Sequence, residues 1–205
     1  VEIPAYALVD GLLGKHFAVL GSTGSGKSYA VTVILRALIE AHPCAHVLLI
    51  DPHDEYAAAF GDLAQRLEPS TLELPYWLMN FDEIAAILAP PRDERSYAEA
   101  AILKEAIYRA RLAWLGSDPG GHVTVDTPVP YRLSDLERLI EEAMGALDKP
   151  EGAAPYRHLL ARLRSVRADP RYGFLFQALH VRDSMAAVLA RLFRIPVACK
   201  PITLI

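Results

Sequence analysis

An eight-residue stretch near the N-terminus, Gly21-Ser22-Thr23-Gly24-Ser25-Gly26-Lys27-Ser28, fits the pattern G-x-x-x-x-G-K-S/T at every fixed position. Residues 17–20 before it are apolar and predict a short strand, and residues 29–40 after it have the apolar spacing of a helix. A strand, a glycine-rich turn and a helix in this order are typical of a phosphate-binding loop. We therefore predict that residues 21–28 bind a polyphosphate.

The residue types in this loop suit a bound nucleotide. Glycines allow a tight turn whose backbone N–H groups point inward, and the following helix adds the positive end of its dipole. We expect Lys27 to neutralise the β and γ phosphates and Ser28 to ligate Mg²⁺. The alternatives are a turn that binds nothing and a dinucleotide fingerprint, which would need a glycine in place of Tyr29. The predicted nucleotide-binding residues are Gly21, Ser22, Thr23, Gly24, Ser25, Gly26, Lys27, Ser28 and Tyr29.

Composition and charge restrict the class of protein. The chain has 205 residues, of which 52% are hydrophobic, so it can bury a core as one domain or as one domain with a large insertion. A net charge of −4 argues against a uniformly basic surface that coats nucleic acid, although a local basic channel is compatible with it. Cys44 and Cys199 have no metal-binding spacing and are expected to be small core residues. Because the sequence has no signal peptide and no apolar run long enough for a membrane, we predict a soluble, cytoplasmic protein.

The pattern along the chain predicts a P-loop α/β fold with an inserted helical part. Residues 46–50 form an apolar run typical of a buried parallel strand, and a strand, a helix and a strand form a right-handed crossover. From about residue 80 to residue 195 nearly every segment predicts a helix, and residues 202–205 return to the sheet. We predict a core at residues 1–79, an all-α insertion at 80–195 and a return strand at 196–205. Because the chain starts without Met and ends on an apolar strand, we expect a fragment.

Several shorter elements are also predicted. Residues 5–9 and 71–74 predict strands, residues 10–14 and 74–78 predict turns, and residues 63–67 predict a short helix. A polar residue followed three positions later by Glu marks three helix starts. These pairs are Asn80 with Glu83, Ser96 with Glu99, and Ser134 with Glu137.

A group of acidic residues follows the second predicted strand. Asp51 comes directly after the apolar run, at the sheet edge where the phosphate loop also lies. We predict that Asp51 holds the Mg²⁺ shell and that Glu55 polarises an attacking water, oriented by His53 or Asp54. The predicted catalytic residues are thus Lys27, Asp51 and Glu55, and the predicted metal-site residues are Ser28 and Asp51. The alternative is that Asp51-Pro52 only ends the strand and Glu55 caps the next helix.

Two other features have both a functional and a structural explanation. The densest basic stretch contains Arg157, Arg162, Arg164, Arg167 and Arg171. It is either a face that contacts phosphates or the solvated surface of a helix. Tyr76 and Trp77 either stack on a base or form a turn packed against the core.

The motifs together resemble the HerA branch of the FtsK/HerA superfamily of DNA-pumping ATPases. The resemblance rests first on the loop with its preceding residues, 16–28, and on Leu49-Ile50-Asp51-Pro52-His53-Asp54-Glu55-Tyr56. Residues 74–77, 169–174 and 200–205 look similar to the same family. The loop alone is generic, whereas Asp-Pro-His-x-Glu-Tyr after the next strand is far more specific.

This resemblance implies a RecA-like core with a helical insertion, ATP and Mg²⁺ as cofactors, and a homo-hexameric ring around double-stranded DNA. It implies that residues 21–28 bind ATP and Mg²⁺, and that the acidic residues at 51–55 lie near the γ phosphate. A nuclease or other effector stacks on the ring in such relatives, in DNA repair or in antiviral defence. Relatives also have an N-terminal β-barrel, a later Walker B Asp-Glu and an arginine finger, and none of these three is found in this sequence.

Three hypotheses follow from the sequence. The first is an ATP-binding motor domain of a DNA translocase or helicase, in which hydrolysis uses a carboxylate outside this chain. The second is a small-molecule or nucleotide kinase with Asp51 as its Mg²⁺ carboxylate and the helical region as a lid. The third is a nucleotide-gated scaffold for an effector, with negligible hydrolysis.

Overall fold

The sheet and the helices belong to two parts of the chain, each with its own core. The computed structural model describes residues 8–91, 94–116, 120–176, 181–196 and 200–205. It divides into a first unit, Val1–Arg66 with Arg191–Ile205, and a second unit, Leu67–Ala190. The boundaries of these units lie at residues 66 and 190, whereas the sequence placed the domain boundaries at residues 79 and 195. A small parallel sheet combined with many helices confirms the predicted α/β class.

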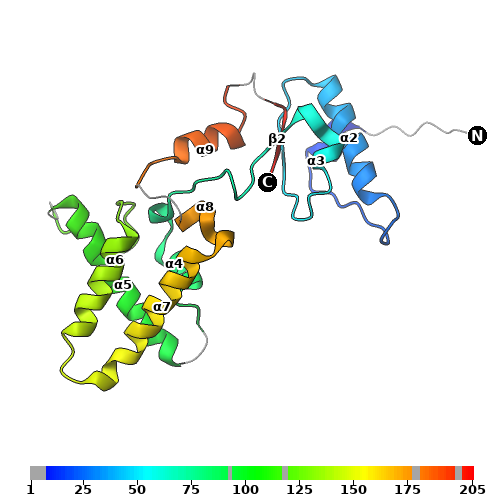
Figure 1. The fold of residues 1–205 in the computed structure, drawn as a ribbon. Helices are drawn as coiled ribbons and strands as arrows, with labels where there is room; N and C mark the ends of the chain where they lie inside the picture. Colours follow the sequence, from blue (N-terminus) through cyan, green and yellow to red (C-terminus); the bar gives the residue numbers. More distant parts are fainter. Residues whose placement is uncertain (1–7, 92–93, 117–119, 177–180, 197–199) are drawn as a thin grey trace, which may run out of the picture. The chain divides into compact units, whose positions relative to one another are not determined.

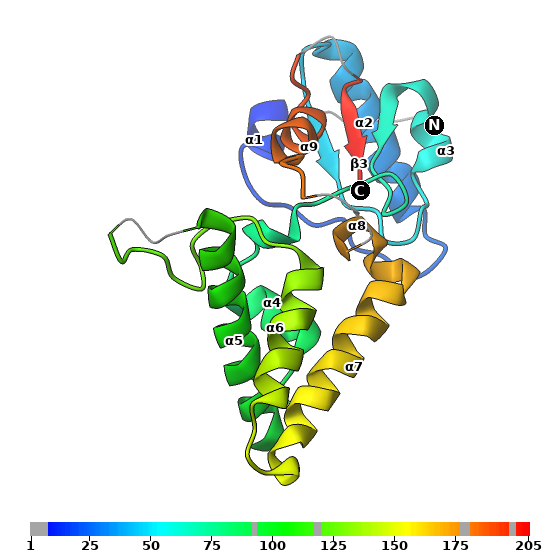
Figure 2. The same ribbon diagram turned by 60° about the vertical axis from the view of Figure 1, so that its left-hand side comes forward.

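Three short parallel strands form the sheet of the first unit. They are β1 (Val47–Leu49), β2 (Ala64–Arg66) and β3 (Ile202–Leu204), in the order β1-β3-β2. β3 lies in the middle of the sheet (Figure 2). Its Ile202 is opposite both Val47 and Ala64. The strands predicted at 46–50 and 202–205 are confirmed. The helix predicted at 63–67 is wrong, because residues 64–66 pair with β3.

Two helices pack against this sheet. α2 (Lys27–Ala41) confirms the predicted helix after the loop, and α3 (Ala57–Phe60) follows β1 (Figure 1). Leu35 and Ile39 of α2 belong to the same apolar cluster as residues of β1 and β3. The buried core of this unit consists of Ile39, Phe60, Ala64, Ile202 and Leu204. This core is small, so each of its side chains matters for stability.

Several predictions for the first unit and its border are corrected. The segment before the loop is not a strand: β1, β2 and β3 pair only with one another in the described residues, and Leu20 is 88% exposed. Apolar composition favours a strand, but a strand needs a hydrogen-bonded neighbour. The turn predicted at 10–14 is largely the helix α1 (Val9–Leu13), which also includes the end of the strand predicted at 5–9. Residues 5–7 lie outside the described residues.

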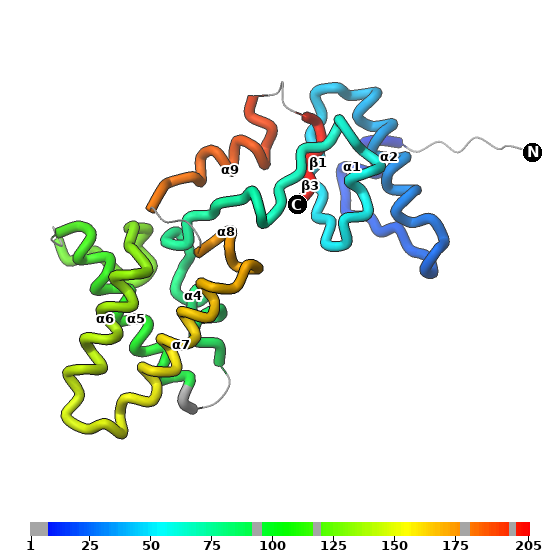
Figure 3. The backbone as a smooth tube through the Cα atoms, in the orientation of Figure 1, coloured from blue at the N-terminus to red at the C-terminus, as the bar shows by residue number. Residues whose placement is uncertain are grey.

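The second unit is helical. Its elements are α4 (Phe81–Leu88), α5 (Glu94–Leu115), α6 (Leu133–Gly145), α7 (Ala154–Ala168) and α8 (Gly173–Phe176), and α9 (Met185–Leu192) crosses the boundary between the units. Short 3-10 helices lie at Tyr76–Leu78, Pro150–Ala153 and Pro170–Tyr172, and a fourth, Gly61–Leu63, belongs to the first unit. α5, α6 and α7 lie side by side (Figure 3). Their fully buried residues include Leu103, Ile107, Leu136, Ile140 and Leu159.

The starts of these helices agree only in part with the predicted capping pairs. Asn80 caps α4, because its side chain accepts from the Glu83 N–H and the Glu83 carboxylate accepts from the Asn80 N–H. α5 begins at Glu94, so Ser96 lies inside the helix and is buried. α6 begins at Leu133, one residue before Ser134. Two of the three predicted caps are therefore wrong.

The aromatic turn at residues 76–78 is part of the second core. The strand predicted at 71–74 is absent in the described residues, and the Leu74 N–H donates instead to the Phe174 carbonyl at 2.7 Å. Tyr76 and Trp77 are both buried, and the Tyr76 hydroxyl donates to the Tyr131 carbonyl oxygen at 2.5 Å. The core interpretation of this aromatic pair is therefore confirmed.

A buried arginine, Arg111, lies beside this aromatic turn and bonds to its backbone. Arg111 is fully buried and donates to the carbonyl oxygens of Thr127 and, at 3.1 Å, Trp77. Its guanidinium also lies 5.6 Å from the centre of the Tyr131 ring. These contacts hold the loop after α5 against the aromatic turn.

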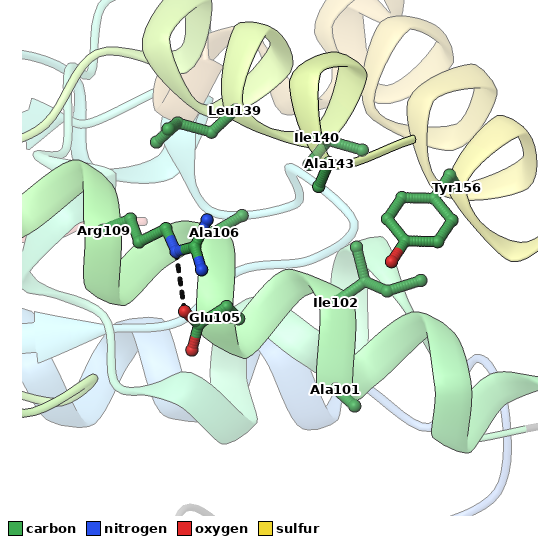
Figure 4. Close-up of a pocket in the computed structure, with 9 residues that line it drawn as sticks. All are labelled: Ala101, Ile102, Glu105, Ala106, Arg109, Leu139, Ile140, Ala143 and Tyr156. Atoms are coloured by element: carbon green, nitrogen blue, oxygen red, sulfur yellow. Dashed lines mark hydrogen bonds and ion pairs between the residues drawn. The ribbon is translucent and has the colours of Figure 1, made fainter. Parts of the chain in front are cut away.

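The surface of the second unit contains a hollow of about 250 Å³ between α5, α6 and the start of α7 (Figure 4). Ile102, Leu139 and Ile140 form its apolar part, and Tyr156 lies across from them. On one wall the Arg109 Nε donates to Glu105 at 2.7 Å. Since this carboxylate and this guanidinium neutralise each other, the hollow presents little net charge.

Candidate nucleotide-binding site

The phosphate loop, residues 21–28, follows α1 after residues 14–20 and includes the first two residues of α2 (Figure 3). Gly24 and Gly26 have φ angles of 81° and 84°, which glycine adopts without the cost that a Cβ imposes. The Ser25 N–H donates to the Ser22 carbonyl at 3.2 Å and closes the turn. A Cβ on Gly21 would lie 2.3 Å from the Ser25 hydroxyl oxygen, so a larger residue there would require the Ser25 side chain to move. The positive φ angles thus explain why glycine occupies positions 24 and 26.

The loop leads directly into the N-terminus of α2. Gly26 is the N-cap residue, and no described side chain accepts a hydrogen bond from the first turn. Residues 21–26 are exposed, so an anion can reach these N–H groups and the positive end of the helix dipole. An uncapped helix start beside an exposed glycine loop fits a phosphate group.

The two side chains of the loop that we predict to be functional, Lys27 and Ser28, have partners within the chain. The Lys27 ammonium donates to the Ser22 carbonyl at 2.8 Å, across the loop. The Ser28 hydroxyl donates to Glu55 Oε2 at 2.7 Å, and the Ser28 carbonyl accepts from the Thr32 hydroxyl at 2.9 Å. The structure thus brings together Lys27, Ser28 and Glu55, although the sequence separates Ser28 and Glu55 by 27 positions.

Asp51 has a different set of partners from the one that we predicted. Its Oδ1 accepts from the Glu55 N–H at 3.1 Å, and its Oδ2 accepts from the Tyr56 N–H at 2.9 Å. Burial acts to raise the pKa of the Asp51 carboxyl. The N–H groups of Tyr56, Glu55 and His53 outweigh burial and hold this pKa below its usual value. Asp51 therefore closes the turn that follows β1, and its carboxylate stays ionised.

The same turn is held from the sheet. Asp54 has a φ of 53°, an uncommon conformation for a residue with a Cβ, and its N–H donates to the Asp51 carbonyl at 3.3 Å. Its carboxylate pairs with Arg66 of β2 at 2.8 Å. We expected Asp54 or His53 to orient a water, whereas the structure gives Asp54 this partner in β2.

Sequence reasoning missed three groups around the site. The Ser22 carbonyl and Arg66 had no sequence signal. Thr32 had one, since a threonine four residues after Ser28 on a helix can bond back to that carbonyl. Tyr29, predicted in the nucleotide-binding set, is 75% exposed at the first turn of α2.

The basic stretch, which lies on α7 and on the 3-10 helix that follows it, is largely paired within its own unit. Arg164 pairs with Glu141 at 2.5 Å, and Arg171 pairs with Asp169 at 2.7 Å. Arg162 donates to the Ile87 carbonyl at 3.1 Å, and Arg167 lies 3.9 Å from Glu137. The solvated-surface interpretation fits these contacts better than a phosphate-binding face.

Other predicted features have simple outcomes. Cys44 is exposed, so its prediction as a core residue is wrong, and Cys199 lies outside the described residues. Within the part of the chain that the structure describes, no helix is long and apolar enough to cross a membrane. No group of three or more His, Cys, Asp or Glu side chains in that part could hold a metal ion.

Comparison with known proteins gives one match over the whole chain. The family model described as "Helicase HerA, central domain" matches residues 1–205. The DNA double-strand break repair helicase HerA of Pyrococcus furiosus is 46% identical over 48 residues, which are 23% of this chain and 8% of that protein.

Two further relatives match over similar lengths. The probable DNA double-strand break repair helicase HerA of Methanocaldococcus jannaschii is 36% identical over 61 residues, 30% of this chain and 12% of that protein. The uncharacterized protein aq_aa31 of Aquifex aeolicus is 36% identical over 67 residues, 33% of this chain and 24% of that protein. The chain thus spans between 8% and 24% of the lengths of these three relatives.

Proposed function

This chain belongs to the family of the HerA helicase central domain, as its motifs predicted, and from this premise we propose that it binds ATP and Mg²⁺ as the motor part of a DNA translocase or helicase. The observation that carries the proposal is the loop at residues 21–28, with left-handed Gly24 and Gly26 at the uncapped start of α2. This loop offers backbone N–H groups, a helix dipole and one lysine to a polyphosphate.

Each residue of the site has a role in this proposal. The N–H groups of the loop hold the β and γ phosphates, and Lys27 leaves the Ser22 carbonyl to contact them. Ser28 offers its hydroxyl oxygen to Mg²⁺, which supplies charge neutralisation on the phosphate oxygens. Glu55 accepts from Ser28, and Asp51 accepts from the Glu55 N–H, so these two carboxylates form the acidic part of the site.

The wider role rests on the family. We include in the proposal a RecA-like core with a helical insertion, a homo-hexameric ring on double-stranded DNA, and a location in the cytoplasm. Two relatives are named as double-strand break repair helicases, which favours a role in repair over a role in antiviral defence. A nuclease or other effector would then act beside the ring. The family match also favours the motor over a small-molecule kinase.

Nucleotide binding tests the first step of this proposal. Titration calorimetry with a nonhydrolysable ATP analogue and Mg²⁺ should record binding to the wild-type chain. Lys27→Ala should weaken it by about 10- to 100-fold, since a charged hydrogen bond to phosphate is lost. Lys149→Ala is the matched control, because Lys149 is an exposed lysine of the second unit. No heat from the wild type, or equal affinity in Lys27→Ala, would refute the proposal.

Motor activity requires a second experiment. In the full-length protein, ATP hydrolysis should increase with long duplex DNA, and particles of the size of a ring should appear in solution. Stimulation by a small acceptor molecule with a monomeric particle would indicate a kinase instead. Binding without hydrolysis would indicate a nucleotide-gated scaffold.

A further inference from the structure

The hydroxyl of Ser28 is held in one orientation before any metal binds. A serine hydroxyl has one proton and two lone pairs, and here the proton is donated to Glu55 Oε2 at 2.7 Å. The lone pairs of the oxygen therefore stay available to a cation at the loop. A ligand that is oriented by a neighbouring carboxylate binds a metal better than one that rotates freely.

The backbone of the turn that carries Glu55 is fixed from two sides. Asp51 accepts the N–H groups of Glu55 and Tyr56, one on each carboxylate oxygen. Asp54, next to Glu55, has its unusual φ of 53° and pairs with Arg66 of β2 at 2.8 Å. The turn is thus held at the end of β1 and at the end of β2.

The carboxylate oxygens of Asp51 have other kinds of hydrogen-bond partners than the Oε2 of Glu55. Both are occupied by backbone donors of its own turn, whereas Glu55 contacts the side chain of the residue that would ligate the metal. The metal-site role that we predicted for Asp51 therefore fits the contacts of Glu55 better.

We propose that Glu55 orients the Ser28 hydroxyl toward Mg²⁺, and that Asp51 is a positioning residue which acts through Glu55 without contacting the metal. This inference rests on the proposed binding of a magnesium nucleotide at the loop. It assigns the acidic side of the metal site to Glu55 and not to Asp51.

The test compares nucleotide affinity with Mg²⁺ and with a chelator, in the whole chain, by titration calorimetry with ADP. The dissociation constant with chelator, divided by the dissociation constant with Mg²⁺, measures what Mg²⁺ adds to nucleotide binding. This ratio is obtained without any turnover. Glu55→Ala should lower this ratio by about 10- to 100-fold, the range seen when a group that orients a metal ligand is removed. Glu55→Gln keeps an oxygen acceptor for the Ser28 proton and should fall between the wild type and Glu55→Ala.

Two double-mutant cycles separate orienting from direct binding. In a Ser28→Ala background Glu55→Ala should have no further effect on the ratio, because the hydroxyl that it orients is gone. In a Glu55→Ala background Asp51→Asn should likewise add nothing. If Asp51→Asn lowers the ratio more than Glu55→Ala does, or if their effects add, then Asp51 contacts the metal and the inference is wrong.

Control variants and outcomes keep the inference separate from the proposed function. Glu40→Ala removes an exposed carboxylate near the other end of α2, about 18 Å along the helix from Ser28, and should leave the ratio unchanged. Thermal unfolding identifies a variant that fails to fold, and Asp51→Asn retains one acceptor for that reason. A wild type that binds no nucleotide would overturn both claims. Magnesium-dependent binding that Glu55→Ala leaves unchanged would overturn this inference alone.

Discussion

Raising the pH above about 10 should weaken the second unit, because Tyr76 is buried there as a neutral phenol. Tyr76 is 6% exposed, and burial raises the pKa of Tyr76 to about 12, above the ordinary range of a tyrosine. Above the unfolded pKa the unfolded chain releases a proton that the folded chain keeps. The stabilisation is therefore complete below the unfolded pKa and is lost as the pH rises through the folded pKa. Two pKa units correspond to about 2.7 kcal/mol.

Tryptophan fluorescence can follow this unit by itself, since both tryptophans of the chain, Trp77 and Trp114, lie within it. Urea unfolding from about pH 8 to about pH 12 should show the loss in the wild type. Tyr76→Phe should be less stable at neutral pH by about 1 kcal/mol, because the bond to the Tyr131 carbonyl is lost. By about pH 12, however, this variant should lose about 2 kcal/mol less than the wild type, because the full difference is reached only above the folded pKa.

A control and a refuting result complete this test. Tyr97→Phe removes a phenol that is 76% exposed on α5, and its alkaline loss should equal that of the wild type. Burial also raises the pKa of Tyr131, so part of the loss will remain in Tyr76→Phe. Parallel pH profiles for the wild type and Tyr76→Phe would show that Tyr76 is not held neutral by its surroundings.

Three further predictions concern local structure. Asn80→Ala should cost about 1 kcal/mol in the urea unfolding of the second unit, because the capping box of α4 is lost, and an unchanged midpoint would contradict this. Ile202→Ala should cost about 2–5 kcal/mol, because this fully buried side chain sits in the middle strand of a small core; circular dichroism and limited proteolysis of residues 8–66 would detect the loss, and wild-type resistance would contradict it. Gly26→Ala should weaken nucleotide binding, because a residue with a Cβ at a φ of 84° carries backbone strain of about 1–2 kcal/mol. No described atom lies within 4 Å of the added Cβ, so the effect comes from strain and not from a clash. Wild-type affinity in calorimetry would contradict this prediction.

The helices were the easiest elements to predict, because their signals are local. The Asn80–Glu83 box could be predicted directly from neighbouring residues. The Ser134–Glu137 pair has the same pattern but does not cap α6. Leu133 is buried in the core, so packing favours a helix that begins one residue earlier. A local signal therefore predicts that a helix exists better than it predicts its first residue.

The strands depended on partners far away in the sequence. Ala64–Arg66 has little strand character of its own and becomes β2 only because it pairs with residues 202–204. Residues 17–20 are apolar enough for a strand, yet among the described residues they pair with none of the three strands. Composition indicates how readily a segment could form a strand, whereas hydrogen bonding to a neighbouring strand decides whether it does.

The site shows where prediction from sequence ends. That Ser28 and Glu55 would lie near each other followed from the crossover rule, which places both at the same edge of the sheet. Which carboxylate contacts Ser28 depends on the path of the turn, and that path includes a left-handed Asp54 held by Arg66. An aspartate directly after a strand is usually the first candidate for a metal-site residue. Here the aspartate is occupied by the backbone of its own turn, so the residue that approaches the loop is the one that this turn projects from the sheet.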